Sequence, residues 1–159
     1  MTNAFTDAVN QLHLSAVDED EQRKLGQRAA LLAAAAIDWH RQIGPLLDVN
    51  QVKTLLRVKS RQAVFDLRNR GRLLAIESHG DSGVYPAFQF AANGRPYAAL
   101  SKILNEMSRA DISFLTIASW LTTPQRGLTG KTPVGWLREG RNDDQVVEAA
   151  RRAAARLSR

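Results

Sequence analysis

Two helix-start signals followed by a helix-stop signal constrain this chain more than any other feature. Asp48 has Gln51 three residues later, which is the spacing of a capping box. Ser60 is a second N-cap residue, and Gly71 stands where a left-handed glycine would end the helix that Ser60 begins. The residues from 57 to 59 lie between the two segments. The pattern therefore predicts two short helices, the second over 61–69, joined by a three-residue turn.

Two short apolar segments follow the second predicted helix. Residues 72–77 (RLLAIE) and 84–90 (VYPAFQF) have the composition and alternation of strands, and the polar residues 78–83 predict a turn between them. Pro86 marks a strand edge or a strand end because it has no N–H to donate. We therefore predict a helix-turn-helix with a β-hairpin wing over residues 46–90.

Basic residues concentrate in the same stretch. The whole chain has a net charge of +6, with 22 Lys and Arg against 16 Asp and Glu. Residues 49–72 alone hold seven basic side chains and one acidic one, a local charge of +6. A basic surface on this motif favours nucleic acid, because the second helix of a helix-turn-helix enters the major groove by its N-terminal end. The alternative is an ordinary solvated surface.

The chemistry of each side chain suggests a role in DNA binding. Arg can bind guanine through two hydrogen bonds, Gln can do so with adenine, and Lys or Ser can hold phosphate. Residues 59–62 are the predicted reading residues, and the arginines of 68–72 are predicted phosphate contacts. The predicted DNA-binding residues are Lys53, Arg57, Lys59, Ser60, Arg61, Gln62, Arg68, Arg70 and Arg72.

The predicted wing differs from the helices in its charge. It carries Glu77 and Asp81, and no Lys or Arg occurs in residues 73–90. Its contacts with DNA would therefore depend on His79, Ser82 and backbone N–H groups.

Residues 1–45 are predicted to form a helical scaffold. Acidic residues at 18–21 suit the first turn of a helix, and residues 23–42 continue as strong helix formers. Leu25, Leu32, Ala36, Trp39 and Ile43 fall on one face. This face either packs on the following domain or pairs with a second copy of the chain, and the sequence leaves both open.

Residues 91–159 predict a small helical bundle. Helical apolar spacing occurs at 97–107, at 111–121 and from 142 or 143 to about 157. Thr132 followed by Pro133 predicts the start of a short helix over 134–138. The fold class is therefore mainly α with a small β-hairpin wing, a winged helix-turn-helix followed by a C-terminal helical bundle.

Several other classes of function are disfavoured. The chain has no Cys, so we expect no disulfide, and the longest apolar run (29–37) is too short to span a membrane. The start of the chain lacks a signal-like pattern, so a cytoplasmic location is expected. His13, His40 and His79 are far apart and lack carboxylate companions. No metal site, cofactor or enzymatic activity is predicted.

Two resemblances go beyond spacing. Residues 47–74, with RVKSRQAV and then RNRGRLLAI, resemble the excisionase and MerR type of winged helix-turn-helix. That resemblance implies that Lys59, Ser60, Arg61 and Gln62 face DNA. The segments VYPAFQF, ALSKIL, ASWLTTPQRGLTGKTPVGWL and DDQVVEAARRAA resemble, in this order, the C-terminal region of Xre/MbcA/ParS-type antitoxins. The chain also resembles actinobacterial DNA-binding proteins that join a winged helix to a similar C-terminal domain.

The antitoxin resemblance implies a helical bundle that binds a RES-type toxin. We thus expect a dimeric, sequence-specific protein for double-stranded DNA, either a transcriptional regulator or an antitoxin that represses its own operon. The alternative is an antitoxin that acts mainly by binding and neutralising its toxin, with Trp120, Trp136 and Arg138 as anchors. A third interpretation is a structural adaptor whose basic face is only solvated.

Overall fold

The computed structural model describes residues 18–78 and 80–158. Its internal contacts divide the chain into two compact units, Met1–Asp38 and Trp39–Arg159. The described part of the first unit is Asp18 and residues 19–38 of helix α2 (Glu19–Ile43), which is most of that helix. Acidic residues fill the first turn of α2, as expected, and Leu25, Leu31, Leu32 and Ile37 are exposed. Residues 1–17 of the predicted scaffold lie outside the described residues.

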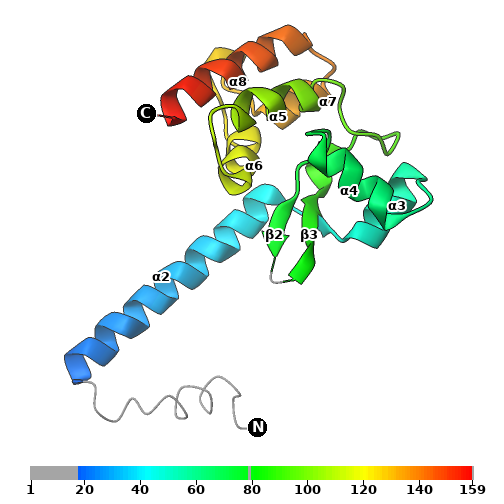
Figure 1. Ribbon diagram of the computed structural model, residues 1–159. Coiled ribbons are helices and arrows are strands. Elements are labelled where there is room, and N and C mark those ends of the chain that lie inside the picture. Colours follow the sequence, from blue (N-terminus) through cyan, green and yellow to red (C-terminus); the bar gives the residue numbers. More distant parts are fainter. Residues whose placement is uncertain (1–17, 79, 159) are drawn as a thin grey trace. The chain divides into compact units, whose positions relative to one another are not determined.

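The second unit contains a three-stranded sheet and two groups of helices (Figure 1). Its first half comprises β1 (Leu46–Leu47), α3 (Val49–Leu56), α4 (Arg61–Asn69), β2 (Ile76–Ser78) and β3 (Gly80–Pro86). Its second half comprises η2 (Ala87–Gln89), α5 (Leu100–Ser108), α6 (Phe114–Thr122), η3 (Arg126–Leu128), α7 (Pro133–Arg138) and α8 (Asp143–Leu157). The predicted fold class, mainly helical with a small hairpin wing, is confirmed. No helix in the described residues is both long and apolar enough to cross a membrane.

The helix-end signals of the sequence are confirmed. Asp48 and Gln51 form the capping box, with each backbone N–H held at 2.8 Å by the other side chain. Ser60 caps α4 by accepting from the Ala63 N–H, and Gly71 has the expected positive φ of 66°.

Two helices of the bundle begin about one turn later than predicted. The helix that was predicted over 97–107 is α5, and it begins at Leu100 rather than at residue 97. α6 begins at Phe114 because Ser113 caps it, and Asp111 before it has the left-handed φ of 55°, which cannot continue a helix.

The hairpin differs from the predicted one. Residues 78–83 are not a turn, because β2 continues to Ser78 and β3 begins at Gly80. β3 ends at Pro86, and the following three residues form η2 instead of extending the strand. β1, which was not predicted, pairs Leu46 with Pro86 and Leu47 with Tyr85, so β3 lies in the middle of the sheet. A two-residue strand gives too short a pattern to be read from sequence.

Two hydrophobic cores share the segment that leads into β2. Leu73 and Ala75 belong to the core of the helix-turn-helix, together with Val52 and Val64. Leu74 and Ile76 belong to the core of the helical bundle. Because alternate side chains of an extended segment point to opposite faces, four residues form a wall common to both cores. The winged helix-turn-helix and the bundle are therefore packed together.

A buried glutamine secures this wall. Gln89 is 1% exposed, and its Oε1 accepts from the Leu74 N–H at 2.8 Å. Its Nε2 donates to the carbonyl oxygens of Leu74 at 2.9 Å and Pro86 at 3.0 Å. Leu74 precedes the start of β2, so strand pairing does not satisfy its backbone groups. The Gln89 amide forms hydrogen bonds with its N–H and its carbonyl oxygen instead.

The bundle is organised around α5 and α8, which pack side by side (Figure 1). Ile103, Leu104 and Met107 of α5 share one core with Val146 and Ala150 of α8. An ion pair between Arg151 and Glu106, at 3.2 Å, joins the two helices at the surface.

The last turn of α2 joins the same compact unit. Ile43 is buried in the bundle core, and Trp39 packs against that core. The Gln42 side chain donates to the hydroxyl oxygens of Thr122 at 3.1 Å and Thr123 at 2.9 Å, at the end of α6. The C-terminal end of α2 is thereby anchored.

The buried amide predicts a large effect of a conservative substitution. Gln89→Leu keeps the approximate size but leaves three buried backbone groups without their partner, so the free energy of unfolding should fall by about 3 kcal/mol. Urea denaturation followed by circular dichroism measures this loss. Gln27→Leu, on exposed α2, is the matched control and should change stability by less than about 0.5 kcal/mol. Equal effects of the two substitutions would contradict the role given to Gln89.

Candidate nucleic-acid interface

The turn between α3 and α4 is built on a left-handed residue. Arg57 has φ 56° and ψ 35°, and its N–H returns to the carbonyl oxygens of Lys53 and Thr54. This conformation is uncommon for a residue other than glycine. The chain turns here between the two helices, and Lys59, Ser60 and the N-terminal end of α4 are exposed.

Arg61, the first residue of α4, is held in place by a residue of α3. Its Nε donates to Asn50 Oδ1 at 2.9 Å, which leaves both terminal amino groups of the guanidinium available. Those two groups are the ones that bind guanine O6 and N7. The sequence did not identify Asn50, because the two residues are eleven positions apart on different helices and no local pattern connects them.

Gln62 is oriented by its own helix. Its Nε2 donates to Asp66 Oδ1 at 3.0 Å, one turn later. The amide keeps one N–H and its carbonyl oxygen, which is the donor and acceptor pair that adenine requires. Both predicted base-reading side chains are thus exposed and restrained.

Ser60 combines capping with a free donor. Its Oγ accepts from the Ala63 N–H at 3.2 Å, so its own O–H remains available to a phosphate oxygen. Five of the other predicted DNA-binding side chains form no ion pair or hydrogen bond with another residue in the described parts of the chain, and they can approach phosphates without breaking a contact. These are Lys53, Arg57, Lys59, Arg70 and Arg72.

Arg68 lies in a different environment. Its side chain is only 21% exposed, and its guanidinium is 3.6 Å from Glu77 Oε1 on β2. Burial raises the pKa of Tyr85 on β3, and the positive charge of Arg68 offsets part of that rise. Arg68 therefore attaches α4 to the hairpin. It differs in this from the five basic side chains that have no partner among the described residues. The predicted wing contacts, His79 and the Ser82 side chain, lie outside what the structure describes.

Of the three predicted partner-binding residues, two are mostly buried and the third lines a different pocket. Trp120 and Trp136 are 7% and 5% exposed and belong to the bundle core. The Trp136 Nε1 donates to the Asn142 carbonyl oxygen at 2.9 Å. Arg138 is exposed and lines a pocket together with Gln42 and Thr132, whereas neither tryptophan lines that pocket. A tryptophan pattern on helices cannot distinguish core residues from surface anchors.

The arrangement is a helix-turn-helix with an exposed, basic second helix, a hairpin beside it and a helical bundle behind it. Within residues 18–78 and 80–158, no group of three or more potential metal-ligating side chains occurs.

Among solved structures, the chain is similar to the NMR structure of Rv2175c, with a TM-score of 0.59 and 26% sequence identity. The match covers 69% of this chain and 81% of that one. No protein-family model matches the chain, and the comparison with curated proteins gives no significant match.

The left-handed turn predicts an unusual stabilisation. Arg57→Gly removes the steric penalty of a positive φ, so the free energy of unfolding should rise by about 1 kcal/mol. Lys59→Gly, two residues later in the same turn and not left-handed, should give no gain. Urea midpoints at a fixed m-value measure both changes. A loss of stability in Arg57→Gly as large as that in Lys59→Gly would contradict the strained geometry.

Proposed function

We propose that this chain is a sequence-specific double-stranded DNA-binding protein, a transcriptional regulator that inserts the N-terminal end of α4 into the major groove. The observation that carries the proposal is the exposed Arg61, which Asn50 holds by its Nε while its base-reading amino groups remain free. A guanidinium held in this way loses less conformational entropy on binding than an unrestrained one.

The surrounding side chains support the same orientation. Lys59 and the Ser60 hydroxyl flank Arg61 at the point where a phosphate lies when a recognition helix occupies the groove. Gln62 follows with a donor and an acceptor. Arg70 and Arg72, at the far end of α4, are placed to hold phosphate contacts further along the backbone.

We propose further that the protein acts as a homodimer through α2. Leu25, Ala29, Leu32 and Ala36 recur at alternating spacings of four and three, the pattern of a coiled-coil seam. In an antiparallel pair that sets Leu25 opposite Ala36 and Ala29 opposite Leu32, the acidic first turn of one helix lies beside the basic last turn of the other. The small alanines allow close approach.

A dimer of this kind has a consequence for DNA recognition. Two copies of α4 related by a two-fold axis would read two inverted half-sites, and the separation of the half-sites would reflect the geometry of the pair.

Arg61→Ala tests the reading helix. The substitution should weaken binding to the preferred site by about 1–3 kcal/mol and relax the base preference, because a bidentate contact to guanine is lost. Lys59→Ala should instead weaken binding to all sequences and lower the log–log salt slope by about one. Fluorescence anisotropy with labelled duplexes at several salt concentrations measures both. Arg109→Ala, an exposed arginine at the end of α5, is the control and should bind as the unmodified protein does. An Arg61→Ala protein with unchanged affinity and preference would refute this assignment.

A second candidate function is that of an antitoxin which also binds a RES-type toxin. The observation that favours protein binding is the exposure of Phe114, Leu115 and Leu157 on the bundle, since large apolar side chains at a surface commonly mark an interface. If a neighbouring reading frame encodes such a toxin, co-expression should yield a stable complex on size-exclusion chromatography. Separate elution of the two proteins would count against this function and would leave the DNA-binding proposal intact.

A further inference from the structure

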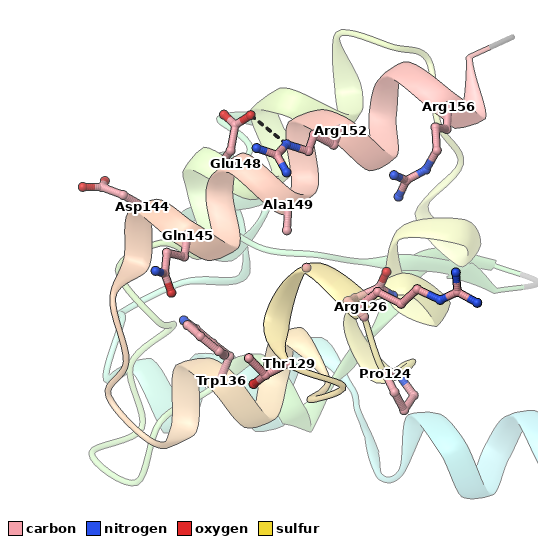
Figure 2. A pocket seen from close by; sticks show the side chains of 12 residues that line it. Pro124, Arg126, Thr129, Trp136, Asp144, Gln145, Glu148, Ala149, Arg152 and Arg156 are labelled. Carbon is pink, nitrogen blue, oxygen red and sulfur yellow. Dashed lines mark hydrogen bonds and ion pairs between the residues drawn. The ribbon is translucent and has the colours of Figure 1, made fainter.

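A groove of about 770 Å³ lies between η3 and α8, on a part of the bundle that the proposed DNA contacts do not use. Figure 2 shows Arg126 from η3 and Arg156 from α8 extending toward the same part of this groove. Neither side chain forms a hydrogen bond or ion pair with any residue in the described ranges, whereas Arg152 on the same helix is paired with Glu148 at 3.1 Å. Two unpaired guanidiniums therefore come from opposite walls.

The charge along the groove is not uniform. Asp144 and Glu148 lie toward the beginning of α8, at the end opposite to Arg156 (Figure 2). A nucleic-acid backbone carries negative charge at regular intervals, so it would meet these carboxylates as well as the arginines. The distribution favours a ligand whose negative charge is confined to one place.

An apolar hollow of about 390 Å³ adjoins the basic end of the groove. Its lining includes Leu115, Trp120 and Leu157, and the two leucines are 51% and 50% exposed. The Trp120 Nε1 is buried and has no hydrogen-bond acceptor among the described residues.

The hollow and the basic end form one surface. Gln125 lines both of them, Arg126 follows it directly, and Leu157 follows Arg156. The Gln125 amide is itself fixed, since its Nε2 donates to the Thr123 carbonyl oxygen at 3.0 Å. We refer to Leu115, Trp120, Arg126, Arg156 and Leu157 as the arginine–leucine surface.

We propose that the arginine–leucine surface binds an acidic amphipathic segment of a partner protein. The apolar side chains of the segment cover Leu115 and Leu157, and its carboxylates form paired hydrogen bonds with the guanidiniums of Arg126 and Arg156. Exposed ion pairs contribute little singly, so the burial of the leucines supplies affinity and the arginines supply selectivity. This interaction goes beyond the proposed DNA recognition and uses none of its residues.

The test uses the full-length protein and a synthetic peptide of about 15 residues, with leucines at helical i, i+3, i+4 and i+7 spacing and glutamates beside these leucines at one end only. Fluorescence polarisation of the labelled peptide gives its dissociation constant. Two matched probes are the same peptide with lysine in place of glutamate and the same peptide with serine in place of leucine. A labelled DNA duplex is the fourth probe.

The protein variants separate the two parts of the surface. Arg126→Glu combined with Arg156→Glu should weaken binding of the acidic peptide about tenfold or more, and Leu115→Ser combined with Leu157→Ser should do the same. Arg109→Glu, at an exposed arginine at the end of α5 that lines neither the groove nor the hollow, should have no effect. Duplex affinity should be unchanged by the leucine pair, which distinguishes a failure of this surface from a failure of DNA recognition.

Two results would overturn the proposal. One is that the acidic peptide does not bind at about 1 mM, or binds no better than the lysine and serine peptides. The other is that the arginine pair weakens duplex binding more than peptide binding, which would assign the groove to nucleic acid. All of these substitutions are at exposed positions, and circular dichroism confirms that each variant is folded before binding is measured.

Discussion

The amide of Gln89 holds the segment on which both hydrophobic cores depend. It binds the N–H and the carbonyl oxygen of Leu74, whose neighbours alternate between the core of the helix-turn-helix and the core of the bundle. An extended segment inside a protein needs a partner for each of its backbone groups, and here β2 begins too late to provide one. The buried Gln89 side chain thus stabilises the four-residue segment 73–76, whose side chains belong alternately to the two cores. Through this shared segment the bundle packs against the helix-turn-helix.

This arrangement explains how the proposed reading end of α4 is positioned. α3 and the hairpin both pack against the segment that Gln89 secures, and the ion pair between Arg68 and Glu77 joins α4 to the hairpin. Asn50 then fixes Arg61 from the neighbouring helix. Lys53, Arg57 and Lys59 lie on α3 and the turn, and Arg70 and Arg72 lie at the far end of α4; among the described residues none of their side chains has a partner. The proposed base contacts are therefore held in place, while the side chains of the proposed phosphate contacts can still move. The same bundle leaves its far surface available for a protein ligand.

The sequence predicted the local features well, because each is governed by residues close together in the chain. The capping box at Asp48, the cap at Ser60 and the end of α4 at Gly71 depend on three-residue or four-residue spacings. The features that it missed depend on contacts between distant residues. β1 pairs with a strand about forty positions away, Gln89 reaches back to Leu74, and Asn50 meets Arg61 across the turn. Trp120 and Trp136, predicted as anchors, are mostly buried in the bundle core, and periodicity alone does not show how far each side chain is covered.

In vitro selection of bound duplexes from a randomised pool, with the purified protein, measures whether α4 reads a DNA sequence. We expect enrichment of a motif with two inverted half-sites whose centres are separated by about one helical turn or a multiple of it, and with a guanine in each half-site. A pool that shows no enriched motif after repeated rounds would contradict sequence-specific reading by α4. A motif with a single, unpaired half-site would contradict the proposed α2 dimer.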